Sequence, residues 1–312
     1  MDDSVAPTRS SKRQSIARDA KEDSEDPLVL PIPAATVARM SPSGSLFANM
    51  AFAVSYQKRE QEKDEVTKAI RDNGGRILEE GFDALFEISK LKEPDAGLML
   101  SAVNKPLGFS ALIADEHSRK TKYMQALALG LPCISGQWVL ACVSKGAILD
   151  WSPYLLCAGQ SSFLGNVMKS RVLPRYSAAE ANLEMTLDAR DKLLEGKSVL
   201  MVTSRGKADK RKPYVFLTRA LGPSRVEQVG DLSEARTKLG SETWDLLYTD
   251  SPKETAAATV FGSANSSGGS KKRKRGPTAT KESTPSPKRI RVIDDETMIQ
   301  SLILGQIMEV QH

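Results

Sequence analysis

The chain has 312 residues, of which 40% are hydrophobic and 27% charged, and its net charge is +5. This length is sufficient for two domains of ordinary size, with further segments outside them. No apolar run approaches the ~20 residues of a transmembrane helix, and the N-terminus has no apolar stretch typical of a signal peptide. We therefore expect a soluble chain with no membrane partner.

The positive charge is concentrated in one segment. Residues 251–289 contain nine basic and two acidic residues, a local charge of +7, so the remainder carries −2. The basic pI of about 9.0 therefore does not by itself indicate a DNA-binding domain.

The metal-binding residue types are sparse. The three cysteines, Cys133, Cys142 and Cys157, cannot all pair, and each has apolar neighbours, which favours buried free thiols. With no Cys-x-x-Cys motif and only two histidines, we expect neither a structural zinc nor any cofactor.

The first part of the chain predicts one α/β unit at residues 44–157, after a disordered segment at residues 1–43 that is rich in Ser, Pro, Asp and Lys. The apolar run LFANMAFAVS, residues 46–55, predicts a buried first strand. Further strands are expected at 76–80, 111–114 and 133–135, and helices before Gly74-Gly75, at 119–129 and at 137–145.

A second unit, residues 196–312, repeats this order in degraded form after a linker at 158–195. In the linker, Ala179, Leu183, Leu187 and Leu194 mark one face of an expected helix. The second unit is expected to have strands at 197–204, 225–229, 244–250 and 290–294. Its expected helices lie before Gly222, at 232–239 and at 295–308, the last one capped by Asp294.

A low-complexity insert, residues 252–288, interrupts this second unit. It is rich in Ser, Gly, Ala, Thr and Pro, and we expect it to be disordered. The last helix has Met298 and Leu302 where the first unit has Trp138 and Cys142, so apolar residues replace apolar residues.

The segment ALIADEHSRKTKYMQALALGLPCISGQWVLACVSKGAILDWSPYLL, residues 111–156, resembles the second half of a BRCT domain. The Gly74-Gly75 turn and the Trp138-x-x-x-Cys142 helix fit that family, in which they have structural roles. The amino-acid sequence of this segment is similar to that of the first BRCT domain of the DNA-damage checkpoint mediators, both the vertebrate mediator and its fungal relatives. The resemblance implies two BRCT repeats in tandem, each a small, mostly parallel sheet flanked by helices.

The same resemblance implies a phosphate-binding site in the first repeat. LFANMAFAVS places Ser55 where such readers have a phosphate-binding hydroxyl, next to the backbone N–H of Tyr56, and HSRKTKY places Lys122 in the position of the cation. Lys120 resembles a second lysine of the fungal relatives, although residues two apart on a helix do not face the same way.

General phosphate-binding chemistry fits these residues but would not have selected them without the family resemblance. A hydroxyl, a free N–H and a cation near a helix N-terminus are what a phosphate needs. Without the resemblance, however, Ser55 would be read as a turn residue and the lysines as solvated. Lys58 and Arg59 could add charge, and Thr203 with Lys207 forms a similar but less favoured set in the second unit.

The function that the resemblance implies is that of an adaptor, not an enzyme, in the DNA-damage checkpoint. Its partners would be checkpoint proteins and a phosphoserine motif near a chain terminus, such as the histone tail phosphorylated around double-strand breaks; homodimerisation stays open. No nucleophile–base set or glycine-rich phosphate loop indicates catalysis.

The basic clusters of the insert predict a nuclear localisation signal and hence a protein acting in the nucleus, on chromatin at damage sites. They comprise Lys271, Lys272, Arg273, Lys274 and Arg275, followed by Lys288 and Arg289. The alternative function is a nuclear scaffold or nucleic-acid-binding protein that acts through this insert, which a steep salt dependence of binding would reveal.

Overall fold

The computed structural model describes residues 45–87, 93–94, 97–204, 206, 208–262 and 290–308. The disordered segment expected at 1–43 and the basic clusters at 271–275 and 288–289 lie outside these residues, as does Lys207. None of the helices in the described residues has the length and apolar character of a membrane span.

The first repeat is built around a parallel sheet of four strands in the order β2-β1-β3-β4. Its strands are β1 (Ala51–Ser55), β2 (Arg76–Ile77), β3 (Ser110–Ala114) and β4 (Cys133–Ser135). Its helices are α1 (Glu60–Asp72), α2 (Thr121–Ala128) and α3 (Gln137–Lys145), with a short 3-10 turn, η1 (Phe82–Leu85). Parallel neighbours need crossover connections, which the helices provide on both faces of the sheet.

The second repeat has the corresponding strand order, β8-β7-β9-β10, and all its pairs are also parallel. Its strands are β7 (Ser198–Val202), β8 (Arg225–Val229), β9 (Leu246–Tyr248) and β10 (Arg291–Ile293). Its helices are α5 (Ala208–Ala220), α6 (Leu232–Ser241), α7 (Lys253–Phe261) and α8 (Asp295–Leu304). The predicted fold class, two α/β units with small parallel sheets flanked by helices, is confirmed.

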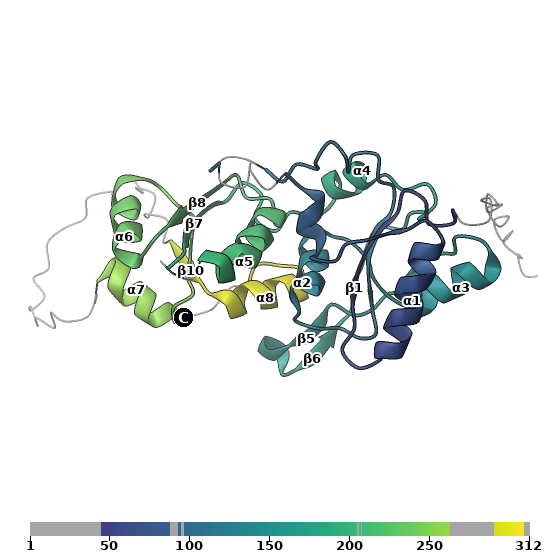
Figure 1. Ribbon diagram of the computed structural model, residues 1–312. Coiled ribbons are helices and arrows are strands. Elements are labelled where there is room, and N and C mark those ends of the chain that lie inside the picture. Colours follow the sequence, from purple (N-terminus) through teal and green to yellow (C-terminus); the bar gives the residue numbers. More distant parts are fainter. Residues whose placement is uncertain are drawn as a thin grey trace, which may run out of the picture. The chain divides into compact units, whose positions relative to one another are not determined.

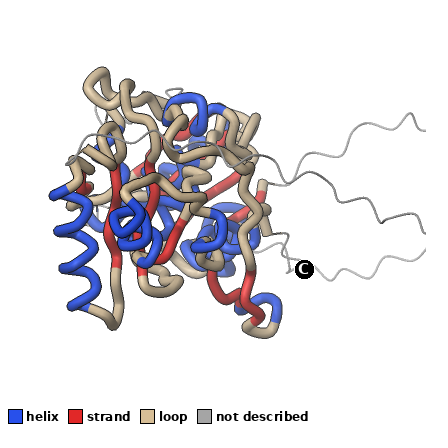
Figure 2. Tube along the Cα trace, turned by 90° about the vertical axis from the view of Figure 1, so that its right-hand side faces the viewer, coloured by secondary structure: helices blue, strands red, loops and turns tan. Residues whose placement is uncertain are grey.

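Between the repeats lie an antiparallel hairpin and a short helix. The hairpin is formed by β5 (Gly159–Ser161) and β6 (Val167–Lys169) around the 3-10 turn η4 (Ser162–Leu164), and another such turn, η3 (Ser152–Tyr154), precedes it. The helix is α4 (Leu183–Asp188). Figures 1 and 2 both show the hairpin projecting beyond the neighbouring helices.

One hydrophobic cluster runs from the first repeat into the second. Met124 and Leu127 of α2 belong to it together with Phe216 of α5 and Leu302 of α8, and α2 packs against both of these helices. Phe86 adds an aromatic contact to Phe216, with ring centroids 5.6 Å apart. The tandem arrangement is therefore stabilised by apolar burial.

Several expected boundaries are wrong. The helix expected from Arg119 begins at Thr121, because Lys120 has an extended backbone with ψ of 150°. The last helix ends at Leu304 rather than Met308, where Gly305 takes a left-handed conformation. The cap predicted at Asp294 is present, since its carboxylate accepts a hydrogen bond from the Thr297 N–H.

Two larger corrections concern the linker and the insert. The expected linker helix is reduced to the six residues of α4; Leu183, Leu187 and Leu194 are buried, but Ala179 is exposed and precedes the helix. The insert expected from residue 252 contains helix α7, which buries Ala256 and Val260 and packs against α6 and β10. Alanine has the highest helix propensity, and this outweighs the low-complexity appearance of the segment.

The first repeat has an aromatic core centred on Trp138. Its side chain is fully buried, with ring centroids 5.9 Å from Phe47 and 5.6 Å from Phe109, and its Nε1 donates to the Leu149 carbonyl at 3.0 Å. Cys142, one turn later, is also fully buried.

The two glycines after α1 are required for different reasons. Gly74 has a φ of 79°, in the left-handed region that favours glycine. Gly75 lies so close to α1 that a Cβ would come within 2.6 Å of Ile70 Cγ2.

Trp138→Ala is expected to lower the free energy of unfolding by ~3–5 kcal/mol, because it removes a buried aromatic side chain and leaves a cavity. Urea denaturation monitored by circular dichroism measures this loss. Gln137→Ala, an exposed neighbour on the same helix, is the control and should change stability by no more than about 0.5 kcal/mol. Equal stability of the two variants would contradict the aromatic core described above.

Candidate functional site

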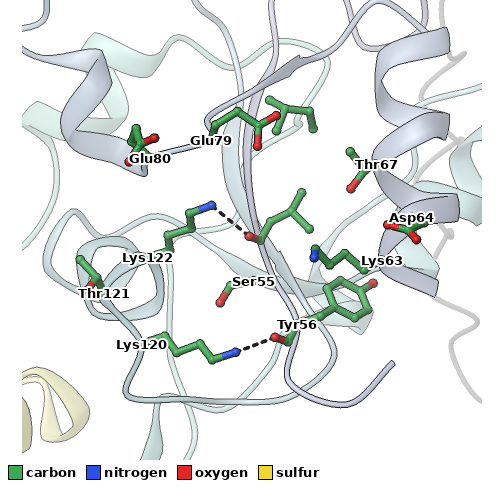
Figure 3. Close-up of a pocket in the computed structure, with 12 residues that line it drawn as sticks. Ser55, Tyr56, Lys63, Asp64, Thr67, Glu79, Glu80, Lys120, Thr121 and Lys122 are labelled. Carbon is green, nitrogen blue, oxygen red and sulfur yellow. Dashed lines mark hydrogen bonds between the residues drawn. The ribbon is translucent and has the colours of Figure 1, made fainter. Parts of the chain in front are cut away.

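A pocket of about 480 Å³ lies at the carboxyl end of β1, where β2 no longer accompanies it. β2 pairs only with Ala51 and Phe52, so the last part of β1 has no strand on that side. Polar groups of β1, α1 and α2 line the space (Figure 3). The pocket therefore results directly from the shortness of β2.

The backbone of β1 presents unpaired groups at this edge. Alternate residues of a strand point their N–H and C=O groups to opposite neighbours, and the Phe52 carbonyl accepts from Leu78 on the β2 side. The carbonyls of Val54 and Tyr56, and the Tyr56 N–H, therefore also point to the β2 side. Among the described residues, the Tyr56 N–H has no hydrogen-bond acceptor.

Two lysines donate hydrogen bonds to the carbonyl groups that β2 leaves unpaired. Lys122 Nζ donates to the Val54 carbonyl at 3.3 Å, and Lys120 Nζ donates to the Tyr56 carbonyl at 2.7 Å. Figure 3 shows Ser55 between these two side chains. The two lysines reach the same pocket because Lys120 precedes helix α2 instead of belonging to it.

Ser55 supplies the hydroxyl. This residue is buried, with only 7% of its surface exposed, and it lines the pocket. The hydroxyl makes no hydrogen bond to a residue in the described part of the chain. The hydroxyl oxygen itself is not among the fully buried polar atoms, so it can accept or donate a hydrogen bond to a ligand in the pocket.

The electrostatic environment of Lys122 is mixed. Burial lowers the pKa of Lys122, and the nearby carboxylates of Glu79 and Glu80 oppose this shift, while the positive charge of Lys63 adds to it. The N-terminus of α2, with Thr121 as its first helical residue, also lines the pocket and favours an anion through its dipole and free N–H groups.

Tyr56 is anchored by its side chain, which is buried beneath α1 and α3. Its hydroxyl donates to Glu62 Oε1 at 3.2 Å, and a Cβ at Gly136 would come within 2.0 Å of the Tyr56 hydroxyl oxygen. Burial, reinforced by Glu62, raises the pKa of Tyr56. The side chain thus holds the adjacent N–H in a defined position.

Asp115 holds the loop that follows Tyr56. Its carboxylate accepts hydrogen bonds from the backbone N–H groups of Gln57 and Lys58, at 3.0 and 2.8 Å. Burial opposes ionisation of Asp115, but these hydrogen bonds outweigh it and lower its pKa. Sequence reasoning missed this role, although an aspartate directly after a buried strand was a usable signal.

Lys58 and Arg59 do not line the pocket. Lys58 forms an ion pair with Glu116 at 3.0 Å, and Arg59 forms one with Glu62 at 3.3 Å; both basic side chains are largely exposed. On α1, the residues that line the pocket are instead Lys63, Asp64 and Thr67. No sequence pattern singled these three residues out.

The second repeat does not reproduce the pocket. The register of its strands places Val202 where the first repeat has Ser55, and Thr203 where it has Tyr56. β8 accompanies β7 along its whole length, and the Val229 carbonyl accepts the Thr203 N–H at 2.8 Å. At the start of α7, Glu254 stands at the helical position that Lys122 has in α2.

Residues 42–143 match the BRCA1 C Terminus (BRCT) domain family. The chain contains a BRCT domain. Because the second unit has the same parallel strand order, the tandem BRCT fold expected from the sequence is confirmed.

Two fungal proteins are similar in sequence. The DNA repair protein crb2 of Schizosaccharomyces pombe is 28% identical over 171 residues, which cover 54% of this chain and 22% of crb2. The DNA repair protein RAD9 of Saccharomyces cerevisiae is 28% identical over 142 residues, 38% of this chain and 10% of RAD9. These similarities support the expected relationship to fungal DNA-damage mediators, although the chain spans only a small part of either relative.

Two solved structures are similar at low sequence identity. The BRCT5-BRCT6 domains of S. pombe Brc1 are 17% identical, with a TM-score of 0.34, over 66% of this chain and 77% of that one. Residues 820–1070 of Rtt107p are 8% identical, with a TM-score of 0.42, over 85% of this chain and 90% of that one.

Proposed function

We propose that this chain is a phosphopeptide-binding adaptor of the DNA-damage checkpoint. The observation that carries this proposal is the convergence of the Ser55 hydroxyl, the Tyr56 N–H and the ammonium groups of Lys120 and Lys122 on one pocket. Ionised donors and backbone N–H groups are the preferred partners of phosphate oxygens. The similarity to fungal DNA repair proteins supports the checkpoint context.

The proposed ligand is a phosphoserine close to a chain terminus, such as the phosphorylated histone tail at double-strand breaks. Arg119, next to Lys120, supports this proposal because it lies at the boundary of the repeats, where Glu296 of α8 holds it at 2.8 Å. Arg119 is about half exposed, and a guanidinium has five N–H donors. It could therefore bind a second acidic group of the peptide, such as a terminal carboxylate.

Ser55→Ala and Lys122→Ala are each expected to weaken binding of a phosphoserine histone-tail peptide at least tenfold, since each removes a hydrogen bond to a charged group worth ~1.5–3 kcal/mol. Isothermal titration calorimetry with phosphorylated and unphosphorylated peptides measures this change. Ser144→Ala and Lys145→Ala, two exposed positions on α3, serve as controls that should bind like wild type. Wild-type affinity in both pocket variants would refute the assignment.

A homodimer is the second part of the proposal, and the β5–β6 hairpin supports it. Phe163, Leu164, Val167 and Met168 are each 44–54% exposed at its tip. In the described part of the chain, β6 pairs with no strand other than β5. Such an open apolar edge can pair with its own copy about a two-fold axis. Ser161 anchors the hairpin base by donating to Gln300 Oε1 at 3.0 Å.

Val167→Lys is expected to shift the protein toward monomer, because it places a charge on the open edge of the hairpin. Sedimentation velocity over a concentration series measures the assembly state. Val172→Lys, at a position 96% exposed and outside the hairpin, is the matched control and should assemble like wild type. A wild-type protein that stays monomeric at every concentration would exclude the dimer.

Nuclear localisation through the basic clusters is the third part of the proposal. Five consecutive basic residues at 271–275 and the pair at 288–289 are typical of nuclear import signals.

Replacing residues 271–275 by Ala in a bulky fluorescent fusion should reduce nuclear accumulation, because the import receptor binds the positive charges. Nuclear accumulation is measured by fluorescence microscopy, and unchanged accumulation would show that this cluster is not the import signal. Lys197→Ala, outside the insert, is the control and should accumulate like the wild type.

A further inference from the structure

The wall of the pocket opposite α2 is formed by one face of α1. Lys63 and Thr67, four residues apart, lie on the same face of this helix, and both line the pocket together with Lys122. Figure 3 shows them on the side of the pocket that faces Lys122. The family resemblance assigned no role to either residue, and sequence reasoning did not single them out.

Among the described residues, Lys63 is held by a single, partly exposed ion pair. In the described part of the chain its ion-pair partner is Glu60, one turn earlier on α1. The Glu60 side chain is 70% exposed and that of Lys63 is 37% exposed. Such solvent-exposed pairs contribute little free energy, so Lys63 can exchange Glu60 for another anion at low cost.

The charge balance of the pocket makes Lys63 important. Three cations, Lys63, Lys120 and Lys122, line it, and so do three carboxylates, Asp64, Glu79 and Glu80. The lining is therefore neutral with Lys63 present. Without Lys63 the lining would lose one of its three positive charges, which would weaken its attraction for a phosphate group.

The charge of Lys63 also acts on the ammonium group of Lys122. The pKa of Lys122 is lowered first by burial, and the charge of Lys63 lowers it further. Two like charges that repel across a shared space are stabilised when an anion lies between them.

We propose that Lys63 is a third phosphate-binding cation, supplied by α1 opposite Lys120 and Lys122. The inference rests on the proposed phosphopeptide function and extends the ligand set of that pocket. On binding, the Lys63 ammonium leaves Glu60 and donates to a phosphate oxygen, which encloses the phosphate between α1 and α2.

Thr67 adds a neutral donor on the same wall. The hydroxyls of Thr218 and Thr237, which also lie within helices, donate to the carbonyl four residues earlier. In the described part of the chain the Thr67 hydroxyl makes no such bond. It is therefore free to donate to a bound phosphate.

Lys63→Ala is expected to weaken binding of the phosphoserine histone-tail peptide about fivefold, a loss typical of one solvent-accessible charge pair. The loss should shrink as salt is raised, because salt screens an accessible charge. Calorimetric titration at low and high salt measures both effects. Lys68→Ala, on the exposed face of the same helix, is the matched control and should bind like wild type.

Glu60→Gln distinguishes a direct contact from a structural role. If Lys63 binds the phosphate, removing its competing carboxylate should tighten binding by about twofold. If Lys63 merely stabilises α1 through Glu60, both Lys63→Ala and Glu60→Gln should weaken binding and lower the melting temperature, which overturns the inference.

Two further outcomes separate this inference from the proposed function. Wild-type affinity in Lys63→Ala, together with lost binding in Lys122→Ala, refutes the role of Lys63 and leaves the phosphopeptide function intact. A wild-type protein that does not distinguish phosphorylated from unphosphorylated peptide refutes both.

Without peptide, an NMR titration of Lys122 should show a higher pKa in the Lys63→Ala variant than in the wild type. An unchanged Lys122 pKa would contradict the placement of the two ammonium groups in one shared space.

Discussion

The short second strand of the first repeat is the constraint on which its candidate site depends. Because β2 ends at Ile77, β1 continues past its neighbour with unpaired backbone groups on one side. Unpaired backbone groups are costly when buried, and here the ammonium groups of Lys120 and Lys122 satisfy the carbonyls of Val54 and Tyr56. The same interactions that stabilise the strand edge therefore position cations beside the Tyr56 N–H and the Ser55 hydroxyl.

The second repeat shows what happens when this constraint is absent. β8 has five residues and pairs with all of β7. The backbone groups that correspond to those lining the pocket of the first repeat therefore form hydrogen bonds within the sheet of the second repeat. Its core is nevertheless equivalent, since Met298 and Leu302 are buried on α8 as Trp138 and Cys142 are on α3. The same fold thus forms the candidate pocket in the first repeat, and the second repeat lacks the unpaired strand edge that forms it.

Sequence reasoning predicted the elements of both repeats because apolar periodicity and terminal glycines mark them locally. It placed β4 and α3 at their observed bounds. It missed α7, whose alanine-rich sequence resembles the low-complexity segment after it, and it overextended the linker helix, because Leu194 is buried by tertiary contacts outside any helix.

The composition of the site was only partly accessible from the sequence. Ser55 and Lys122 were selected by resemblance to a family, whereas Lys63 and Thr67 are far from Lys122 in the sequence and meet it only through the crossover of α1. The sequence argued against a shared role for Lys120 and Lys122, because residues two apart on a helix do not face the same way. This argument does not apply, because Lys120 has an extended backbone and precedes the helix. A change of one or two residues in a helix boundary thus decided which side chains share the pocket.

The charge balance of the pocket bears on whether nucleic acid would bind at the pocket itself, whereas the alternative function acts through the basic insert. A surface that binds nucleic acid nonspecifically needs an excess of positive charge along its length. Here Asp64, Glu79 and Glu80 offset the three lysines, so a continuous polyanion would meet repulsion around the pocket. Under the proposed function, a single phosphate that enters between the ammonium groups gains their attraction over a short distance. In the proposed complex, selectivity for one phosphate group would therefore arise from the placement of charges and not from their sum.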